Sequence, residues 1–329
     1  MKHNDEQMAS VQMAGVARTL LVLKNYEWLE AEAKAIGVSI IPIKGIDLLQ
    51  TVYHEQLDRH VRDIDVLCQG EAECRLLVER LCREHYRLEF PFSMRPEVLA
   101  AKQKVSLLSN SPTMVNIDVH LAFVTKKFFS QTIGTFNVDA LARCHEGRMD
   151  EYDRWLFLAQ HAAFHLFSDV KWTRDLAVLY LRYSPEQKTV LRERAVCYGF
   201  RRVMVAAVYQ LRKMMSPQES DTELHALQLS ASERRFLSFL RQFDRPFSRK
   251  PFDRFIAAWW EFAFIHSRGQ RLSSWFRLVF PSKGNLSNIY RINKPVLVVA
   301  YYPLHFFISF LSGCFFWLLY AMYAKFSGE

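Results

Sequence analysis

Residues 62–67 have the sequence Arg62-Asp63-Ile64-Asp65-Val66-Leu67, in which two carboxylates alternate with apolar side chains. Such alternation is typical of a β-strand, where residues i and i+2 point to the same face. Two carboxylates side by side repel each other unless a cation lies between them. Their oxygens are hard ligands that suit Mg²⁺ or Mn²⁺. The pattern therefore predicts a strand over residues 63–67 that carries the metal ligands Asp63 and Asp65.

A third carboxylate follows about fifty residues later in the sequence Asn-Ile-Asp-Val-His, which ends at His120. It is Asp118, on a strand predicted over residues 114–123. Placed beside the first strand, the three acids would hold two metal ions, which lower the pKa of an attacking hydroxyl and stabilise a leaving pyrophosphate. His120 shares the face of Asp118. Three roles remain open for His120: it could bind phosphate, orient a metal-bound carboxylate or occupy a core position.

Basic residues and a turn stand upstream of the acidic pair. Lys44-Gly45 follows a buried strand predicted over residues 38–43 and begins a helix. Such a turn presents backbone N–H groups and a positive helix dipole to a phosphate. Arg59 and Arg62 lie just before the acids, where they would bind phosphate or shield the acidic pair.

The order of these pieces resembles that of the bacterial uncharacterised nucleotidyltransferase family, a branch of the DNA-polymerase-beta-like superfamily. The resemblance covers roughly residues 10–290 and implies Asp63, Asp65 and Asp118 as metal ligands. It also implies that Lys44-Gly45 replaces the usual Gly-Ser phosphate loop, so the serine hydroxyl is missing. The segments that carry it are Ile43-Lys44-Gly45, Tyr53, Arg59 to Leu67, Asp118-Val119-His120, His161, Trp172-Thr173-Arg174-Asp175-Leu176 and Phe280-Pro281-Ser282.

The hydrophobic pattern indicates an α+β fold class, with a mixed sheet and helices followed by helices alone. We expect a nucleotidyltransferase-like domain over residues 1–150, a helical domain over 151–290 and a hydrophobic tail over 291–329. The other strands are predicted over 87–92 and 104–108. Helices are predicted over 8–36, 46–53, 71–85, 155–167, 172–183, 185–198, 202–215 and 232–242.

The C-terminal run Pro295–Ala324 contains no formally charged residue. A helix of about 20 residues crosses the hydrocarbon layer of a bilayer, and Leu304–Ala324 has that length. We expect Pro303 to end or kink a preceding short segment. Membrane association through residues 295–324 is the favoured interpretation, as a span or as a re-entrant or monotopic insertion. A buried core helix is the alternative.

Positive charge is concentrated next to this run. The chain has a formal charge of +9, and residues 241–294 hold eleven Lys and Arg against three acidic residues, a net charge of +8. This placement predicts a juxtamembrane surface for anionic lipid and a cytoplasmic catalytic part at the inner membrane. A nucleic-acid groove would spread its charge over the catalytic domain, so nucleic acid is disfavoured as a partner without being ruled out.

The sequence therefore predicts an enzyme that moves a nucleoside monophosphate from an NTP onto an unknown hydroxyl or phosphate acceptor. An acceptor made at the membrane, such as a cell-surface glycan, would match the tail. The alternatives are a toxin-like nucleotidyltransferase that acts on tRNA or protein, and a non-catalytic scaffold with a degenerate transferase fold. His161 and His165 share a helix face as half of a zinc site, although a structural or substrate-lining role is favoured for them.

Overall fold

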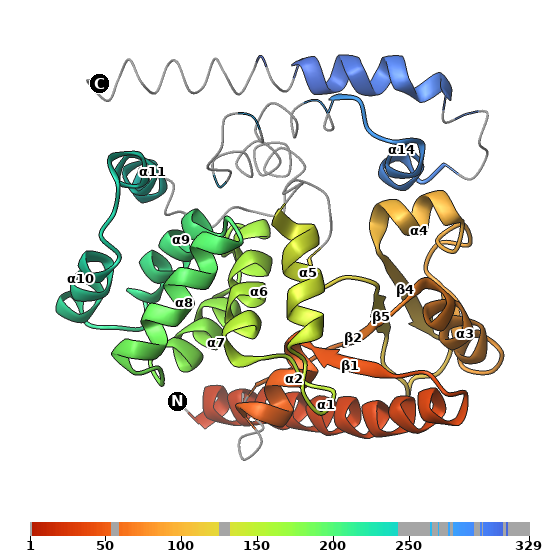
Figure 1. Ribbon diagram of the computed structural model, residues 1–329. Coiled ribbons are helices and arrows are strands. Elements are labelled where there is room, and N and C mark those ends of the chain that lie inside the picture. The colour runs from red at the N-terminus through yellow and green to blue at the C-terminus, as the bar shows by residue number, and fades with distance from the viewer. Residues whose placement is uncertain are drawn as a thin grey trace. The chain divides into compact units, whose positions relative to one another are not determined.

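The computed structural model describes residues 2–53, 59–124, 132–242, 264, 269, 276, 279–292, 297, 299–311 and 314. The chain divides into two compact units (Figure 1). The first contains Met1–Thr125 and Ala140–Asp150, and the second contains Lys126–Asp139 and Glu151–Glu329.

The first unit is built on a five-stranded mixed sheet in the order β1-β2-β5-β4-β3. β2 and β5 are parallel, and the other neighbouring pairs are antiparallel. The mixed sheet confirms the predicted α+β class. Its strands are β1 (Ile40–Ile43), β2 (Ile64–Cys68), β3 (Tyr86–Leu88), β4 (Lys104–Ser109) and β5 (Ile117–His120).

The helices of the first unit bury the apolar side chains of this sheet. α2 packs against β1 and β2, and α3 packs against β2, β3 and β5. Ile64 and Val66 of β2 are fully buried, which explains the apolar positions of the opening stretch. The helices that lie entirely within this unit are α1 (Lys2–Ala35), α2 (Lys44–Thr51), α3 (Glu71–Cys82) and α4 (Pro96–Lys102).

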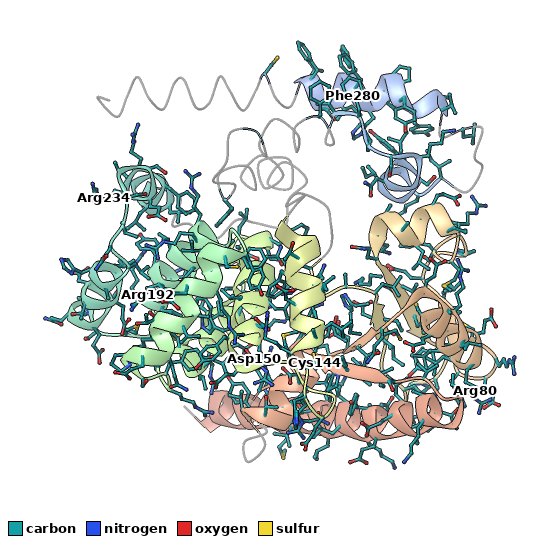
Figure 2. All side chains as sticks on the ribbon, viewed as in Figure 1. Arg80, Cys144, Asp150, Arg192, Arg234 and Phe280 are labelled. Carbon is teal, nitrogen blue, oxygen red and sulfur yellow. The ribbon has the colours of Figure 1, made fainter. Side chains whose placement is uncertain are left out.

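The long helix α1 ends just before a glycine and forms an ion pair with α3. Gly37 adopts a φ of +72°, a conformation that costs glycine little, and the Val38 N–H donates to the Ala33 carbonyl at 2.9 Å. Arg80 of α3, labelled in Figure 2, pairs with Glu32 of α1 at 2.7 Å. These contacts fix the position at which the chain enters β1, and β1 in turn positions the Lys44-Gly45 turn.

The described part of the second unit is helical, as predicted. α9 is buried along most of its length and packs against α6, α7, α8, α10 and α11. Trp155 is fully buried, and its indole N–H donates to the Leu176 carbonyl at 3.2 Å. The labelled helices of its described part are α6 (Glu151–Phe164), α7 (Val170–Tyr180), α8 (Pro185–Cys197), α9 (Arg201–Leu211), α10 (Pro217–Ala226), α11 (Ala231–Gln242) and α14 (Lys283–Tyr290). A further helix covers residues 299–311, and α5 (Thr132–Ala142) contains residues of both units.

The sequence analysis did not predict α4, α5, α10 and α14. Two of them begin with a proline, Pro96 in α4 and Pro217 in α10. Proline fits the first turn of a helix because the N–H it lacks has no partner there. The strand predicted over 87–92 is also shorter, since β3 ends at Leu88.

The C-terminal segment only partly tests the predicted span. Within the described part of the chain, no helix is long and apolar enough to cross a membrane. The expected span Leu304–Ala324 lies largely outside the described residues, which from 312 onward include only residue 314. Residues 299–311 are helical throughout, so the expectation that Pro303 ends a segment is wrong, whereas the alternative that it kinks the helix stays a prediction. Pro303 is exposed on this helix.

Candidate functional site

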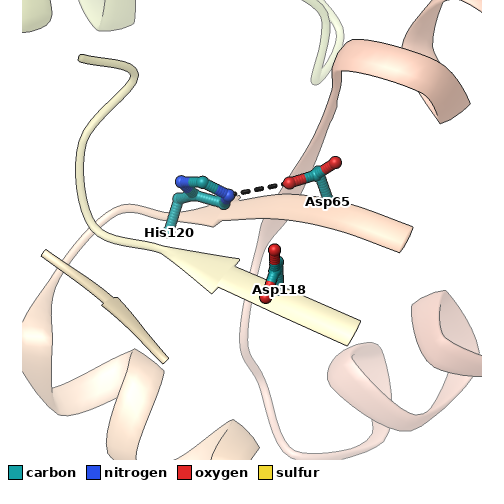
Figure 3. Close-up of side chains that lie close together, drawn as sticks. All are labelled: Asp65, Asp118 and His120. Atoms are coloured by element: carbon teal, nitrogen blue, oxygen red, sulfur yellow. Dashed lines mark hydrogen bonds and ion pairs between the residues drawn. The ribbon is translucent and has the colours of Figure 1, made fainter. Parts of the chain in front are cut away.

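The two strands that carry the predicted acids are direct neighbours. β2 and β5 run parallel, and Asp65 lies opposite Asp118 in their register. Asp65, Asp118 and His120 each offer a ligand atom, and these atoms all lie within 4.8 Å of one another (Figure 3). The predicted juxtaposition of Asp65 and Asp118 is therefore confirmed, and His120 joins them from the same face of β5.

His120 is a buried member of this cluster with one unused nitrogen. Its Nε2 lies 2.9 Å from Asp65 Oδ1. Its Nδ1 is buried and has no hydrogen-bond partner within the described structure. Buried polar atoms normally have a partner, so this nitrogen is available to a ligand or to a substrate group.

Lys44 contacts the acidic cluster directly. Its Nζ lies 2.6 Å from Asp65 Oδ1 and 3.4 Å from His120 Nε2. The residue has a φ of +54°, a left-handed conformation that is uncommon and costly for a residue with a Cβ. The β1–α2 turn therefore holds Lys44 in a strained conformation at the acids.

Gly45 allows this turn to approach the segment that leads into β2. A Cβ on Gly45 would lie 2.9 Å from Val61 Cγ1, closer than side-chain carbons normally pack. Val61 is itself buried. Glycine at this position is thus explained by the close approach of two segments of the site.

Lys104 is a site residue that the sequence analysis missed. Its Nζ lies 2.6 Å from Asp118 Oδ2, with the lysine and aspartate side chains 27% and 19% exposed. Burial lowers the pKa of Lys104, but the negative charges of Asp118, Asp65 and Asp63 outweigh this and raise it above its ordinary value. Lys104 faces His120 across the β4–β5 register, a relationship that becomes visible only once the strands are paired.

Asp63 stands apart from the other acids. It precedes β2 instead of lying within it, and it is exposed. It is not part of the cluster of three ligand atoms. Its pKa is nevertheless raised, first by lost hydration and then by the negative charges of Asp65 and Asp118, so it shares their electrostatic field.

The two predicted arginines lie in the segment before β2. Arg59 is buried, and its guanidinium donates to the His60 carbonyl at 2.8 Å. Arg62 is exposed, and its carbonyl accepts from the Arg18 guanidinium at 2.9 Å. The Arg59 side chain thus stabilises the loop from inside, whereas the exposed Arg62 remains the better candidate for a phosphate contact.

Asp65 and His120 have the protonation states that a divalent cation requires of its ligands. Burial raises the pKa of Asp65, but Lys44 and His120 outweigh it and hold that pKa well below its usual range. Burial and the Lys44 charge lower the pKa of His120 to about 4. Metal binding needs ionised carboxylates and neutral imidazole. Asp65, Asp118 and His120 therefore fit a divalent cation, with Lys44 and Lys104 as competing positive charges.

The lowered pKa of His120 predicts an acid-dependent loss of stability. Between pH 6.5 and about 4 the unfolded state binds a proton that the folded state does not, so stability falls as pH falls. The expected loss between pH 8 and pH 5 is about 2 kcal/mol, measured by urea unfolding in chelator. His120→Gln should flatten this dependence, whereas the exposed His145→Gln should not. Equal pH dependence in all three proteins would contradict a neutral buried His120.

His161 and His165 of the helical unit form an aromatic cluster with Trp172. The His165 ring stacks on Trp172, with centroids 4.9 Å apart and an interplanar angle of 29°. The His161 ring meets Trp172 edge-on, with centroids 5.5 Å apart. This packing supports the structural role that was favoured over half of a zinc site.

A comparison with known protein families agrees with the geometry of the first unit. Residues 6–216 match a family described as uncharacterised nucleotidyltransferase. No curated protein and no solved structure matches the chain significantly. The matched segment contains Lys44, Asp65, Lys104, Asp118 and His120. It ends well before residue 290, so the resemblance suggested for Phe280-Pro281-Ser282 lies beyond it.

Proposed function

Because this chain belongs to the uncharacterised nucleotidyltransferase family, we propose that the cluster around Asp65 moves a nucleoside monophosphate from an NTP to a hydroxyl or phosphate acceptor. The observation that supports this most strongly is the parallel pairing of Asp65 with Asp118. Pairing places two ionisable carboxylates on adjacent strands, where repulsion is relieved by a cation.

Asp65, Asp118 and His120 would hold a Mg²⁺ or Mn²⁺ ion, with Asp63 within reach of the same electrostatic field. When bound, such an ion neutralises the charge that develops on the transferring phosphoryl group and lowers the pKa of an attacking hydroxyl. Asp118 is partly exposed, so an acceptor can approach it from solvent. In this proposal Asp118 helps to activate the acceptor.

The two lysines would take different roles in the reaction. Lys44 lies at the start of α2, where its ammonium and the backbone of Gly45 are suited to the triphosphate. We propose that Lys44 exchanges Asp65 for phosphate oxygens when nucleotide binds. Lys104 balances the charge of Asp118 through the 2.6 Å ion pair, and Arg62 adds a further positive charge.

The acceptor is proposed to be made at the membrane, for example a cell-surface glycan or a lipid-linked intermediate. Support comes from the uncharged run Pro295–Ala324 and the net charge of +8 over residues 241–294. In this arrangement the catalytic unit is cytoplasmic and the C-terminus associates with the inner membrane.

Nucleotides labelled at either end of the triphosphate test the reaction. With an α-labelled NTP, the label should move to an acceptor in a membrane lipid extract. With the γ-labelled NTP, it should leave in pyrophosphate. One NTP should bind at least about ten-fold more tightly with Mg²⁺ than with chelator, because the ion screens the phosphates from the acids.

Other acceptor pools and negative outcomes decide between the alternatives. If the label appears in tRNA or in protein and not in the lipid extract, the acceptor is not made at the membrane and the protein is a toxin-like nucleotidyltransferase. Transfer of the γ-label would show phosphoryl instead of nucleotidyl transfer. If no NTP binds with or without Mg²⁺, the enzyme proposal fails and the scaffold remains.

A further inference from the structure

The helix over residues 299–311 has an apolar surface that faces outward. The large apolar side chains on this side are between 44% and 59% exposed. At about 100° per residue, they occupy roughly half of the helix circumference. They are Val299, Leu304, Phe306, Phe307, Phe310 and Leu311.

The opposite side of the same helix is polar and buried. His305 and Ser309 are each 6% exposed. His305 Nδ1 lies 3.1 Å from the Tyr290 hydroxyl, and His305 Nε2 lies 3.3 Å from Ser309 Oγ. A helix on a water-exposed surface shows the reverse arrangement, with apolar residues inward and polar residues outward.

α14 and the segment before it complete this surface. The Tyr302 hydroxyl donates to the Pro281 carbonyl at 2.8 Å, which ties the helix to the start of α14. Phe280 is 52% exposed, and its ring centroid lies 5.8 Å from that of Phe306. Figure 2, in which Phe280 is labelled, shows side chains projecting from the helix on the side away from α14. We call the six apolar residues above, together with Phe280, the outer apolar face.

The charges on the neighbouring helix α14 favour an anionic partner for the outer apolar face. Lys283 and Arg291 are exposed at the two ends of α14, within the segment that carries the net charge of +8. Tyr290, Tyr301 and Tyr302 are partly buried against Leu286 and Ile292 of the same segment. Apolar side chains flanked by tyrosine and by basic residues are the pattern of a helix that lies in the boundary between headgroups and acyl chains.

We propose that the outer apolar face inserts into one leaflet of an anionic bilayer, with α14 on the headgroup side. The buried hydrogen bonds of His305 keep its ring satisfied within the protein, so that only apolar side chains meet lipid. The proposal deepens the membrane association of the proposed function, because it assigns the contact to the helix over residues 299–311 and to Phe280. It does not depend on nucleotidyl transfer.

Vesicle co-sedimentation of the full chain tests this contact. Vesicles of phosphatidylcholine alone and with about one third phosphatidylglycerol are compared. The native chain should bind the anionic vesicles, and Phe307→Glu with Phe310→Glu should lower its partition coefficient at least ten-fold. Val138→Glu with Val170→Glu is the matched control, because these valines are 67% and 65% exposed elsewhere and should leave binding unchanged. Lys283→Gln with Arg291→Gln should remove much of the preference for anionic vesicles, about five-fold for each charge.

The outcomes separate the possible explanations. Unchanged vesicle binding by the Phe307→Glu, Phe310→Glu chain would overturn the proposal and place the contact elsewhere. A different result would overturn the proposal in favour of an interface between two copies of the chain. In that case the native chain would not bind vesicles and would form dimers, and the same double variant would be monomeric. NTP turnover is measured on each variant in detergent. If the Phe307→Glu, Phe310→Glu chain loses vesicle binding and keeps its turnover, the lipid contact is supported independently of the reaction. If it keeps vesicle binding and loses turnover, the lipid proposal fails and the nucleotidyltransferase proposal is unaffected by that failure.

Discussion

Asp65→Asn is expected to lower kcat/KM for nucleotidyl transfer by at least about 10³-fold. Asp65 is buried, lies opposite Asp118, and accepts from Lys44 at 2.6 Å and contacts His120 at 2.9 Å. Asparagine keeps the shape of the side chain but removes the charge. A cation would then lose a carboxylate ligand, which contributes several kcal/mol of transition-state stabilisation. Initial rates of pyrophosphate release measure the change.

Three companion variants make this result specific. Glu97→Gln removes an exposed carboxylate from α4 and should leave the rate unchanged. Asp118→Asn should resemble Asp65→Asn. Asp63→Asn should have a smaller effect, because Asp63 precedes β2 and stands outside the cluster of ligand atoms. Circular dichroism confirms that each protein is folded. A folded Asp65→Asn protein with native turnover would remove this cluster from the active site.

Lys44→Met is expected to weaken the binding of NTP and to strengthen the binding of metal. Loss of charge-assisted hydrogen bonds to phosphate costs about 1.5–3 kcal/mol, which raises the KM for NTP by about 10- to 100-fold. Without nucleotide, the same change should tighten Mn²⁺ binding, because the Lys44 ammonium no longer occupies Asp65 Oδ1. Steady-state kinetics measure the first effect, and metal titration calorimetry measures the second.

The control for Lys44 is a lysine on the same unit without the acidic contact. Lys34 is exposed near the end of α1, so Lys34→Met should change neither KM nor metal affinity. Lys44→Arg preserves the charge and should retain part of the nucleotide affinity. If Lys44→Met tightens metal binding and leaves the KM for NTP unchanged, Lys44 serves only as a counter-ion. Unchanged metal affinity would contradict competition between the lysine and the cation.

Local patterns in the sequence were enough to identify most of the elements of the site. The alternation around Ile64 and Val66 predicted β2, and the run before Lys44 predicted β1, because each strand needs a buried apolar face. Helices beginning with Pro96 and Pro217 were missed, since proline both ends and begins helices and sequence position alone does not separate the two uses. The structure describes only part of Leu304–Ala324, so the predicted span over these residues stays a prediction.

The sequence by itself determined the chemical groups: the acids at 63, 65 and 118, the Lys44-Gly45 turn, and the uncharged C-terminal run. These follow from residue type and short-range periodicity. Only the tertiary structure showed that Asp65, Asp118 and His120 form the tight cluster, that Lys104 neutralises Asp118, and that His305 and Ser309 face inward. The reason is that strand order, register and helix rotation depend on contacts between residues far apart in the chain, which no local pattern specifies.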